Sequence, residues 1–289
     1  MILKNIHIRI FVSLLFCLTH IKAKPETIKI INKTDSALNV NFTVPEQTVA
    51  SIKLKKLDDL HDAIVADSSE KIRKAVLDGA DVNHLKDGKT PLLWAIILQH
   101  YNAIETLLHL GAKPDDTCVT QVIKMQDIKC LLSLVRHGIT NLDLKKTIAI
   151  LSTSIIHGNL DSIALIRELV SRGYNANEFW HSATTLTHCK PIEAEEIVRF
   201  LLSRGANPNY INTYDCYTRT PLMMAVVYYP NKQIVKILID AGADINTPIQ
   251  PNLRSPEQSL LSYAIEFNKN GSKERKEVIA LLLEQGASL

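Results

Sequence analysis

The 289-residue chain lacks the short motifs by which many catalytic sites are found in a sequence. It contains no G-x-G-x-x-G, no phosphate-binding G-x-x-x-x-G-K-S/T loop, no H-E-x-x-H and no G-x-S-x-G. Large aromatic residues are also few, at 6% of the chain. These absences give no support to an enzyme, and we expect no catalytic residue, no cofactor and no small-molecule substrate.

Cysteine is scarce too, and its spacing excludes the common zinc sites. The five cysteines form no C-x-x-C and show no ligand spacing with histidine. Cys118 and Cys130 would begin the two antiparallel helices of one hairpin, beyond the ~7 Å between Cα atoms that a disulfide allows. We therefore predict unpaired thiols. His181, His188 and Cys189 lie close in sequence, but we expect His188 and Cys189 to point apart, which disfavours a metal site or a nucleophile.

The first 23 residues have the pattern of a secretory signal. Lys4, His7 and Arg9 precede an apolar run at residues 10–18, and Ala23 offers a cleavage position. The run is well short of the ~20 apolar residues that span a bilayer. We expect cleavage and export, to the periplasm or the medium, and keep an uncleaved membrane anchor as the alternative.

The charge balance depends on this segment. The whole chain has 33 basic and 30 acidic residues, and residues 1–23 contain three of the basic ones and no acid. The remaining chain would be neutral overall, so it shows no electrostatic footprint for nucleic acid or for an anionic membrane.

Residues 24–56 predict a small β-rich segment. The ranges 27–32 and 38–44 alternate apolar and polar residues, many of them β-branched, and 49–54 alternates loosely. A turn at 33–36 separates the first two ranges. We expect a hairpin or a three-stranded sheet that caps the rest of the chain.

From residue 57 onward the pattern is helical and repeats itself. A glycine closes each unit, at intervals mostly near ~33 residues. These glycines are Gly79, Gly111, Gly138, Gly173, Gly205, Gly242 and Gly286. Two units open with Thr-Pro-Leu, at Thr90 and Thr220, where threonine caps a helix and proline fits its first turn.

The chain over residues 57–289 resembles the ankyrin repeat family, with about seven degenerate repeats. The resemblance implies a mainly α fold, a solenoid of helix-turn-helix units joined by hairpins. Repeat one would start at Asp58, repeat four near Ala149 with three extra residues, and repeat five at Thr184. Repeat six would carry one extra residue near Tyr228, and repeat seven would carry six after Phe267. The family's histidine after leucine is kept only at His61.

The resemblance further implies a protein partner, bound on the concave face by hairpin tips and first helices. Large aromatics at such positions are typical of interfaces. The residues that we predict to contact a partner are Trp94, Phe179, Trp180, His188, Tyr214, Tyr217, Met224 and Tyr263. For Phe179 and Trp180 an equal alternative is that they fill gaps against repeat four.

The predicted function is a non-enzymatic, exported protein-interaction module. A second hypothesis is an envelope-associated scaffold that is held by an uncleaved signal anchor. A third is an enzyme with an unfamiliar site in residues 24–56 or around His181.

Overall fold

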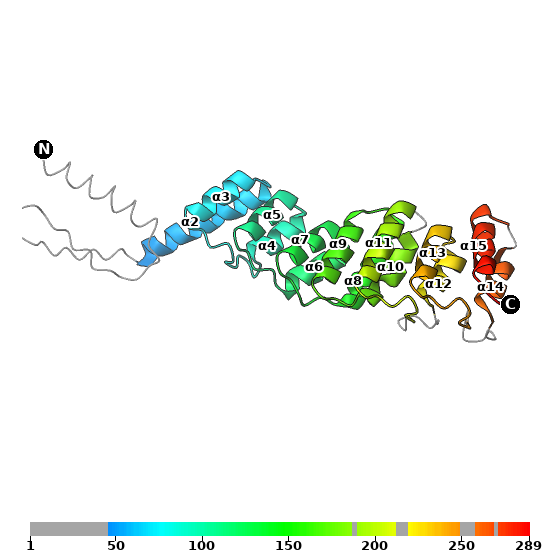
Figure 1. Cartoon of the computed structure of the whole chain (residues 1–289). Helices are drawn as coiled ribbons and strands as arrows, with labels where there is room; N and C mark the ends of the chain where they lie inside the picture. The colour runs from blue at the N-terminus through cyan, green and yellow to red at the C-terminus, as the bar shows by residue number, and fades with distance from the viewer. Residues whose placement is uncertain (1–45, 187–189, 212–218, 249–257, 269–270) are drawn as a thin grey trace, which may run out of the picture. The chain divides into compact units, whose positions relative to one another are not determined.

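The computed structural model describes residues 46–186, 190–211, 219–248, 258–268 and 271–289 (Figure 1). The expected signal at 1–23 and the expected strands at 27–32 and 38–44 lie outside these residues. The chain consists of two compact units, 1–121 and 122–289, and the boundary lies within helix α6 (Asp116–Met125). No helix among the described residues is long and apolar enough to cross a membrane.

Unit 1 consists of helix pairs. Helix α2 (Glu46–Val65) packs against α3 (Ser69–Leu77), and α4 (Pro91–Leu98) packs against α5 (Tyr101–His109). The pairs also touch helix to helix, since α2 contacts α4 and α3 contacts α5. Leucine and isoleucine at helical spacing fill the interior, among them Leu60, Ile64, Ile96 and Leu107 at 2% exposure or less.

Unit 2 repeats this arrangement in two layers. The first layer contains α8 (Leu144–Ile156), α10 (Trp180–Thr185), α12 (Pro221–Met223) with η3 (Met224–Tyr228), and α14 (Leu260–Phe267). The second layer contains α7 (Ile128–Arg136), α9 (Asp161–Ser171), α11 (Pro191–Ser203), α13 (Lys232–Asp240) and α15 (Lys273–Glu284). A 3₁₀ helix, η1 (Ala176–Phe179), precedes α10. Within each layer successive helices touch, as α9 touches α11 and α11 touches α13.

The seven predicted closing glycines all end a helix. Each has a positive φ, between 81° and 98°, the left-handed region that glycine enters without steric cost. At Gly111 the following N–H, that of Ala112, donates to the carbonyl of Leu107 at 2.9 Å and satisfies an otherwise orphaned helix end. The predicted starts at Thr90 and Thr220 are also confirmed, since each threonine side chain accepts from the backbone N–H three residues later.

The expected strand at 49–54 is wrong, because these residues continue α2 toward the N-terminus. Repeat one therefore has no helix start at Asp58. The alternating apolar residues in this range are not buried on one face, since Ile52 is 47% and Leu54 is 61% exposed. Lysine, alanine and leucine favour helix, and the buried Leu60 and Ile64 anchor that helix in unit 1.

Two other predicted starts are displaced. Helix α8 begins at Leu144 rather than near Ala149, because the Asp143 side chain caps it by accepting from the N–H of Lys146. Helix α10 begins at Trp180 rather than at Thr184. Thr184 lies inside this helix and is fully buried, where its hydroxyl donates to the carbonyl of Trp180.

The extra residue of repeat six is absorbed as a π-helical turn, η3. The carbonyl of Val227 lies in the last turn of the helix, where carbonyls have no intrahelical partner. It accepts from the Arg275 guanidinium of α15 at 2.9 Å. The predicted insert of repeat seven lies between α14 and α15, and residues 269–270 of it are outside the described range.

Asparagine side chains bridge four of the repeats to the next repeat of the same unit. The Asn209 Oδ1 accepts from the N–H of Asp244 at 2.8 Å, and its Nδ2 donates to the carbonyl of Gly242 at 2.9 Å. Equivalent Oδ1 bridges run from Asn83 to Lys113, from Asn177 to Asn207 and from Asn246 to Ser288. Each bridge joins the loop after the second helix of one repeat to the equivalent loop of the next repeat.

Where repeat three lacks this asparagine, repeat four supplies the bridge. The Tyr174 hydroxyl donates to the carbonyl of Thr140 at 2.6 Å, and the Arg172 guanidinium donates to the carbonyl of Arg136 at 3.0 Å. The connection between repeats is therefore kept even where the sequence pattern is degenerate.

Replacing the bridging asparagine tests its contribution. We expect Asn209→Ala to lower the free energy of unfolding by about 1–2 kcal/mol, because two hydrogen bonds between repeats are lost. The measurement is urea unfolding of the whole chain. The control Gln233→Ala removes an exposed amide on α13 and should change stability by less than about 0.5 kcal/mol. Equal effects of the two substitutions would contradict the bridging role.

The start of α6 predicts a pH effect. The Asp115 carboxylate accepts from the Thr117 hydroxyl at 2.6 Å and from the N–H of Cys118 at 2.9 Å. Burial raises the pKa of Asp115, but these hydrogen bonds outweigh burial and lower the pKa below its ordinary value. The ionised cap therefore stabilises the fold above the unfolded pKa of ~3.9, and this contribution is lost as pH falls through the lower folded value.

We expect Asp115→Ala to cost about 1 kcal/mol at neutral pH, a difference from the natural chain that shrinks below pH ~3.9. Asp115→Asn keeps a neutral acceptor and should remove only the pH dependence. Urea unfolding at several pH values measures both. A stability gap between the natural chain and Asp115→Ala that stays constant down to pH ~2 would refute the assignment.

Candidate functional site

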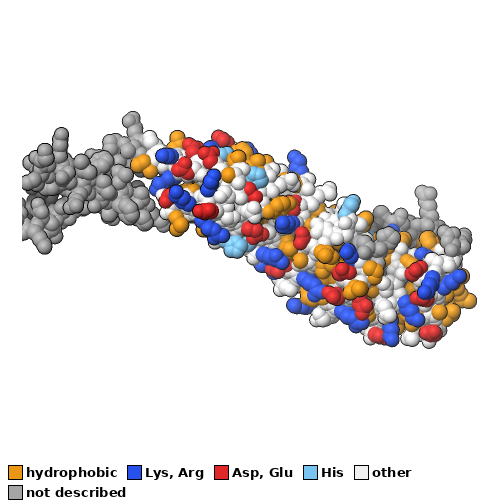
Figure 2. Space-filling view, turned by 90° about the horizontal axis from the view of Figure 1, so that it is seen from above, with side chains coloured by type: hydrophobic (Ala, Val, Ile, Leu, Met, Phe, Trp, Pro, Cys, Tyr) orange, Lys and Arg blue, Asp and Glu red, His pale blue; other side chains and the backbone are white. Residues whose placement is uncertain are grey.

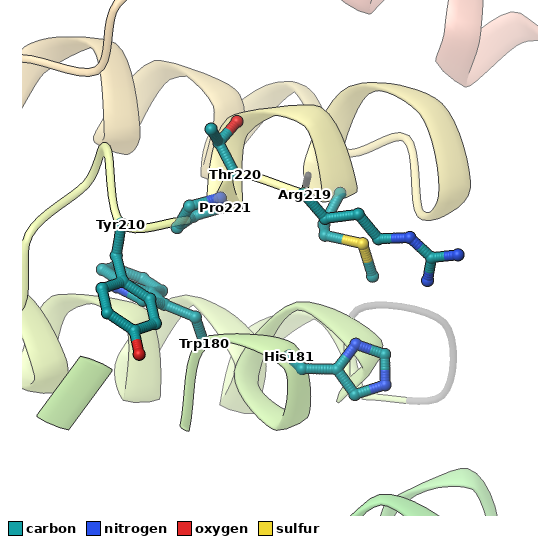
Figure 3. A pocket seen from close by; sticks show the side chains of 7 residues that line it. Trp180, His181, Tyr210, Arg219, Thr220 and Pro221 are labelled. Carbon is teal, nitrogen blue, oxygen red and sulfur yellow. The ribbon is translucent and has the colours of Figure 1, made fainter. Parts of the chain in front are cut away.

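A small depression opens in the first layer of unit 2, between α10 and the start of α12 (Figure 3). Its lining residues are Trp180, His181, Tyr210, Arg219, Thr220, Pro221 and Met224. The depression is shallow and largely open to solvent, and it encloses little space of its own. It is therefore too small for a whole small substrate.

Arg219 links this depression to a pair of tyrosines. Its guanidinium carbon lies 4.8 Å from the ring centroid of Tyr228, a cation–π contact. Tyr228 in turn lies close to Tyr263 of α14. Burial raises the pKa of Tyr263, and the neighbouring Tyr228 and Glu266 raise it further, so the hydroxyl stays protonated at neutral pH.

At the other end of the depression the local charge is negative. The Tyr210 hydroxyl donates to Glu178 Oε1 at 3.1 Å. Burial raises the pKa of Tyr210, and the charge of Glu178 adds to this shift. Figure 3 shows Tyr210 at one end and the side chains of Arg219 and His181 projecting toward the opposite end.

Phe179 and Trp180 are buried, at 0% and 3% exposure. The Trp180 indole N–H donates to the carbonyl of Asn207 at 3.0 Å. Their burial agrees with the alternative that they fill gaps inside the repeats. It disagrees with the prediction that they lie exposed in a hairpin and contact a partner. The physical reason is the displaced start of repeat five, because Phe179 ends η1 and Trp180 begins α10, so neither residue lies in a loop.

The exposure that we expected for Met224 is also wrong. Met224 is 4% and Tyr263 is 8% exposed. Successive first-layer helices touch, since η3 contacts both α10 and α14. Met224 and Tyr263 lie at the same position of successive first-layer helices, four residues after the caps Thr220 and Ser259. This position is largely covered by the neighbouring helices, and only part of each side chain reaches the surface.

Trp94 of unit 1 is the predicted aromatic that is half-buried rather than enclosed. Its indole N–H donates to the carbonyl of Lys86 at 3.3 Å, the ammonium of Lys89 lies 4.7 Å from its ring, and His61 meets the ring edge at 5.2 Å. One face of the tryptophan is thus held by its own unit. The predicted residues His188, Tyr214 and Tyr217 lie outside the described residues.

Sequence reasoning missed Arg219 and Tyr228. Arg219 directly precedes the Thr220 cap, and Tyr228 ends the segment that carries the extra residue. The irregular repeat length was the signal that could have singled them out, because insertions in repeat proteins often map to a binding face.

The buried Cys118 offers no activated thiol. Cys118 and Cys130 are buried and form no disulfide, as the spacing predicted. Burial raises the pKa of the Cys118 thiol to about 12, so it is protonated at neutral pH and is a poor nucleophile. In the view of Figure 2, basic and acidic side chains are interspersed over the described surface of each unit, in line with the neutral charge balance.

Comparison with known proteins identifies the repeats. The family profile "Ankyrin repeats (3 copies)" matches residues 157–249 and 196–289, and the profile "Ankyrin repeat" matches residues 87–119. No curated protein matches the chain.

Among solved structures, the ankyrin repeat domain of human ASB11 is 17% identical, with 80% of this chain and 98% of that chain covered and a TM-score of 0.47. The ankyrin repeat domain of Bcl-3 is 18% identical, with 78% and 97% covered and a TM-score of 0.45. The two family profiles together match more than half of the sequence. The chain therefore belongs to the ankyrin repeat family.

Proposed function

We propose that this protein is a non-enzymatic interaction module whose partner contacts the first layer of unit 2. Ankyrin repeats are in general protein–protein interaction modules, which supports the class of function. The observation that carries the proposal is the group of half-buried side chains Tyr210, Arg219 and Tyr228 on adjacent repeats. Tyrosine and arginine dominate interface hot spots because they offer large contact area together with polar groups.

The partly buried state of these residues favours binding. Their rings and guanidinium are already ordered by contacts such as the 4.8 Å stacking of Arg219 on Tyr228. A partner would therefore pay little additional entropy for immobilising them.

We propose export for the compartment, on the strength of the signal pattern in residues 1–23. The alternative of an envelope-associated scaffold differs in one measurable respect. The intact mass of the protein purified from its natural source would lack about 23 residues after cleavage and would include them if the segment stays as an anchor.

Site-specific crosslinking tests the binding surface. We expect p-benzoylphenylalanine placed at position 228 to form a discrete crosslinked product in cells that contain the natural partner. The same group at position 199, on α11 of the second layer, should form none. Mass spectrometry of the product identifies the partner. Crosslinks from position 199 without any from position 228 would place the interface on the second layer and contradict the proposal.

A further inference from the structure

The end of helix η3 is held in part by repeat seven, which consists of α14 and α15. Both of these helices contact η3. Arg275 of α15 donates from its guanidinium Nη2 to the carbonyl of Val227 at 2.9 Å. Because Val227 lies in the last turn of η3, its carbonyl has no partner within the helix, and the arginine of the next repeat acts as a cap for that turn.

Repeat seven also holds the side chain that follows this carbonyl. Tyr228 lies beside Tyr263 of α14, whose pKa is raised first by burial and then by this neighbour. The Tyr263 ring packs on Phe267 with 4.7 Å between the ring centroids, and the Arg275 guanidinium lies 5.8 Å from the centre of the Phe267 ring. These contacts form a closed path, because Arg275 also reaches the carbonyl of the residue before Tyr228.

The π-helical turn of η3 determines the direction in which Tyr228 points. The N–H of Tyr229 donates to the carbonyl of Met224 at 3.0 Å. The N–H of Asn231 donates to the carbonyl of Ala225 at 3.2 Å. In an ordinary α-helical turn the extra residue would move into the loop that follows. Since one residue corresponds to about 100° around a helix axis, Tyr228 would then turn away from its present neighbours.

The burial of Arg275 carries a cost that limits its contribution to stability. The side chain is half-buried, and its Nη1 nitrogen is buried without a hydrogen-bond partner among the residues that the structure describes. A buried donor without a partner is unfavourable, so this loss offsets part of what the bond to Val227 contributes. We therefore expect Arg275 to matter more for the conformation of η3 than for the stability of the whole chain.

We propose that repeat seven positions the candidate binding surface of repeat six, because Arg275 fixes the turn and Tyr263 fixes the ring of Tyr228. Arg275 and Tyr263 are positioning residues, and Tyr228 is the residue that contacts the partner. The inference rests on the proposed function, since it names what orients that surface. It also couples the two repeats, because any change that frees α15 from η3 releases Tyr228 and weakens partner binding.

Amide hydrogen exchange of the whole chain tests the positioning role without a partner. In Arg275→Ala we expect the amides of Tyr229 and Asn231 to exchange at least about tenfold faster than in the natural chain, because they donate within the turn that Arg275 caps. Amides in the middle of α13, those of Ile237 and Leu238, should keep their rates. A purely structural role of the arginine would accelerate both groups together.

Two further substitutions on α15 serve as rescue and control. Arg275→Lys keeps a donor for the carbonyl of Val227, so the two turn amides should stay nearer their natural rates than in Arg275→Ala. Lys276→Ala removes the neighbouring exposed cation and should change none of these rates.

Fluorine NMR of 3-fluorotyrosine at position 228 gives a second measurement that leaves Arg275 unchanged. Tyr263→Phe removes only the hydroxyl beside Tyr228, so the buried ring stays in place. We expect the fluorine resonance in Tyr263→Phe to move toward its position in the urea-unfolded chain. Tyr174→Phe, which removes a hydroxyl from repeat four, should leave the resonance unchanged and is the matched control.

Natural exchange rates at Tyr229 and Asn231 in Arg275→Ala, or equal acceleration throughout α13, would overturn the inference and leave the proposed function in place. If Arg275→Ala does not fold, an unchanged fluorine resonance in Tyr263→Phe overturns it instead.

Crosslinking from position 228 in cells separates the two claims. A yield that falls several-fold in Arg275→Ala supports both, and an equal yield in the variant and the natural chain contradicts the positioning role. If the natural chain forms no crosslink from position 228, the proposed function fails, while the exchange rates still decide how η3 is held.

Discussion

Every helix pair in this chain faces the same constraint, since about 30 residues cannot bury enough apolar surface to stay folded alone. Each pair must share its apolar faces with the next, and the polar loops must then meet at a fixed spacing. The bridge from Asn209 to Asp244 and Gly242 satisfies backbone groups at that spacing. Where the asparagine is missing, Tyr174 and Arg172 make other bonds between the same loops.

The same constraint explains how the chain tolerates irregular repeats. An extra residue in repeat six cannot lengthen the space between neighbouring helices, so it widens one helical turn instead. The carbonyl of Val227, in the last turn of this helix, accepts from Arg275 of the next repeat. Tyr228 ends the wider turn and contacts Arg219, so the irregular segment forms part of the candidate binding surface.

Local features of the fold could be predicted from the sequence, and features that depend on neighbours could not. The glycine ends and the caps at Thr90 and Thr220 depend on one residue's own backbone preference or hydrogen bond, and these predictions are confirmed. Thr184 was predicted to start a helix because it lies at the expected distance before Gly205. That spacing does not show which neighbouring residues are buried. Burial of Phe179 and Trp180 decided the helix start instead.

The candidate site was predicted least well for the same reason. Met224 and Tyr263 occupy the same position of successive first-layer helices, but contact between these helices covers both side chains. Tyr228, which contacts Arg219, ends the π-helical turn, and no periodic pattern contains such a turn.

Amide hydrogen exchange measures the bridges between repeats most directly. The N–H groups of Lys113, Asn207, Asp244 and Ser288 belong to exposed residues, and each donates to an asparagine of the preceding repeat. The account predicts that these amides exchange far more slowly than exposed loop amides, and only when adjoining repeats open. Exchange at the rate of an unstructured peptide would show that the repeats are not joined in this way.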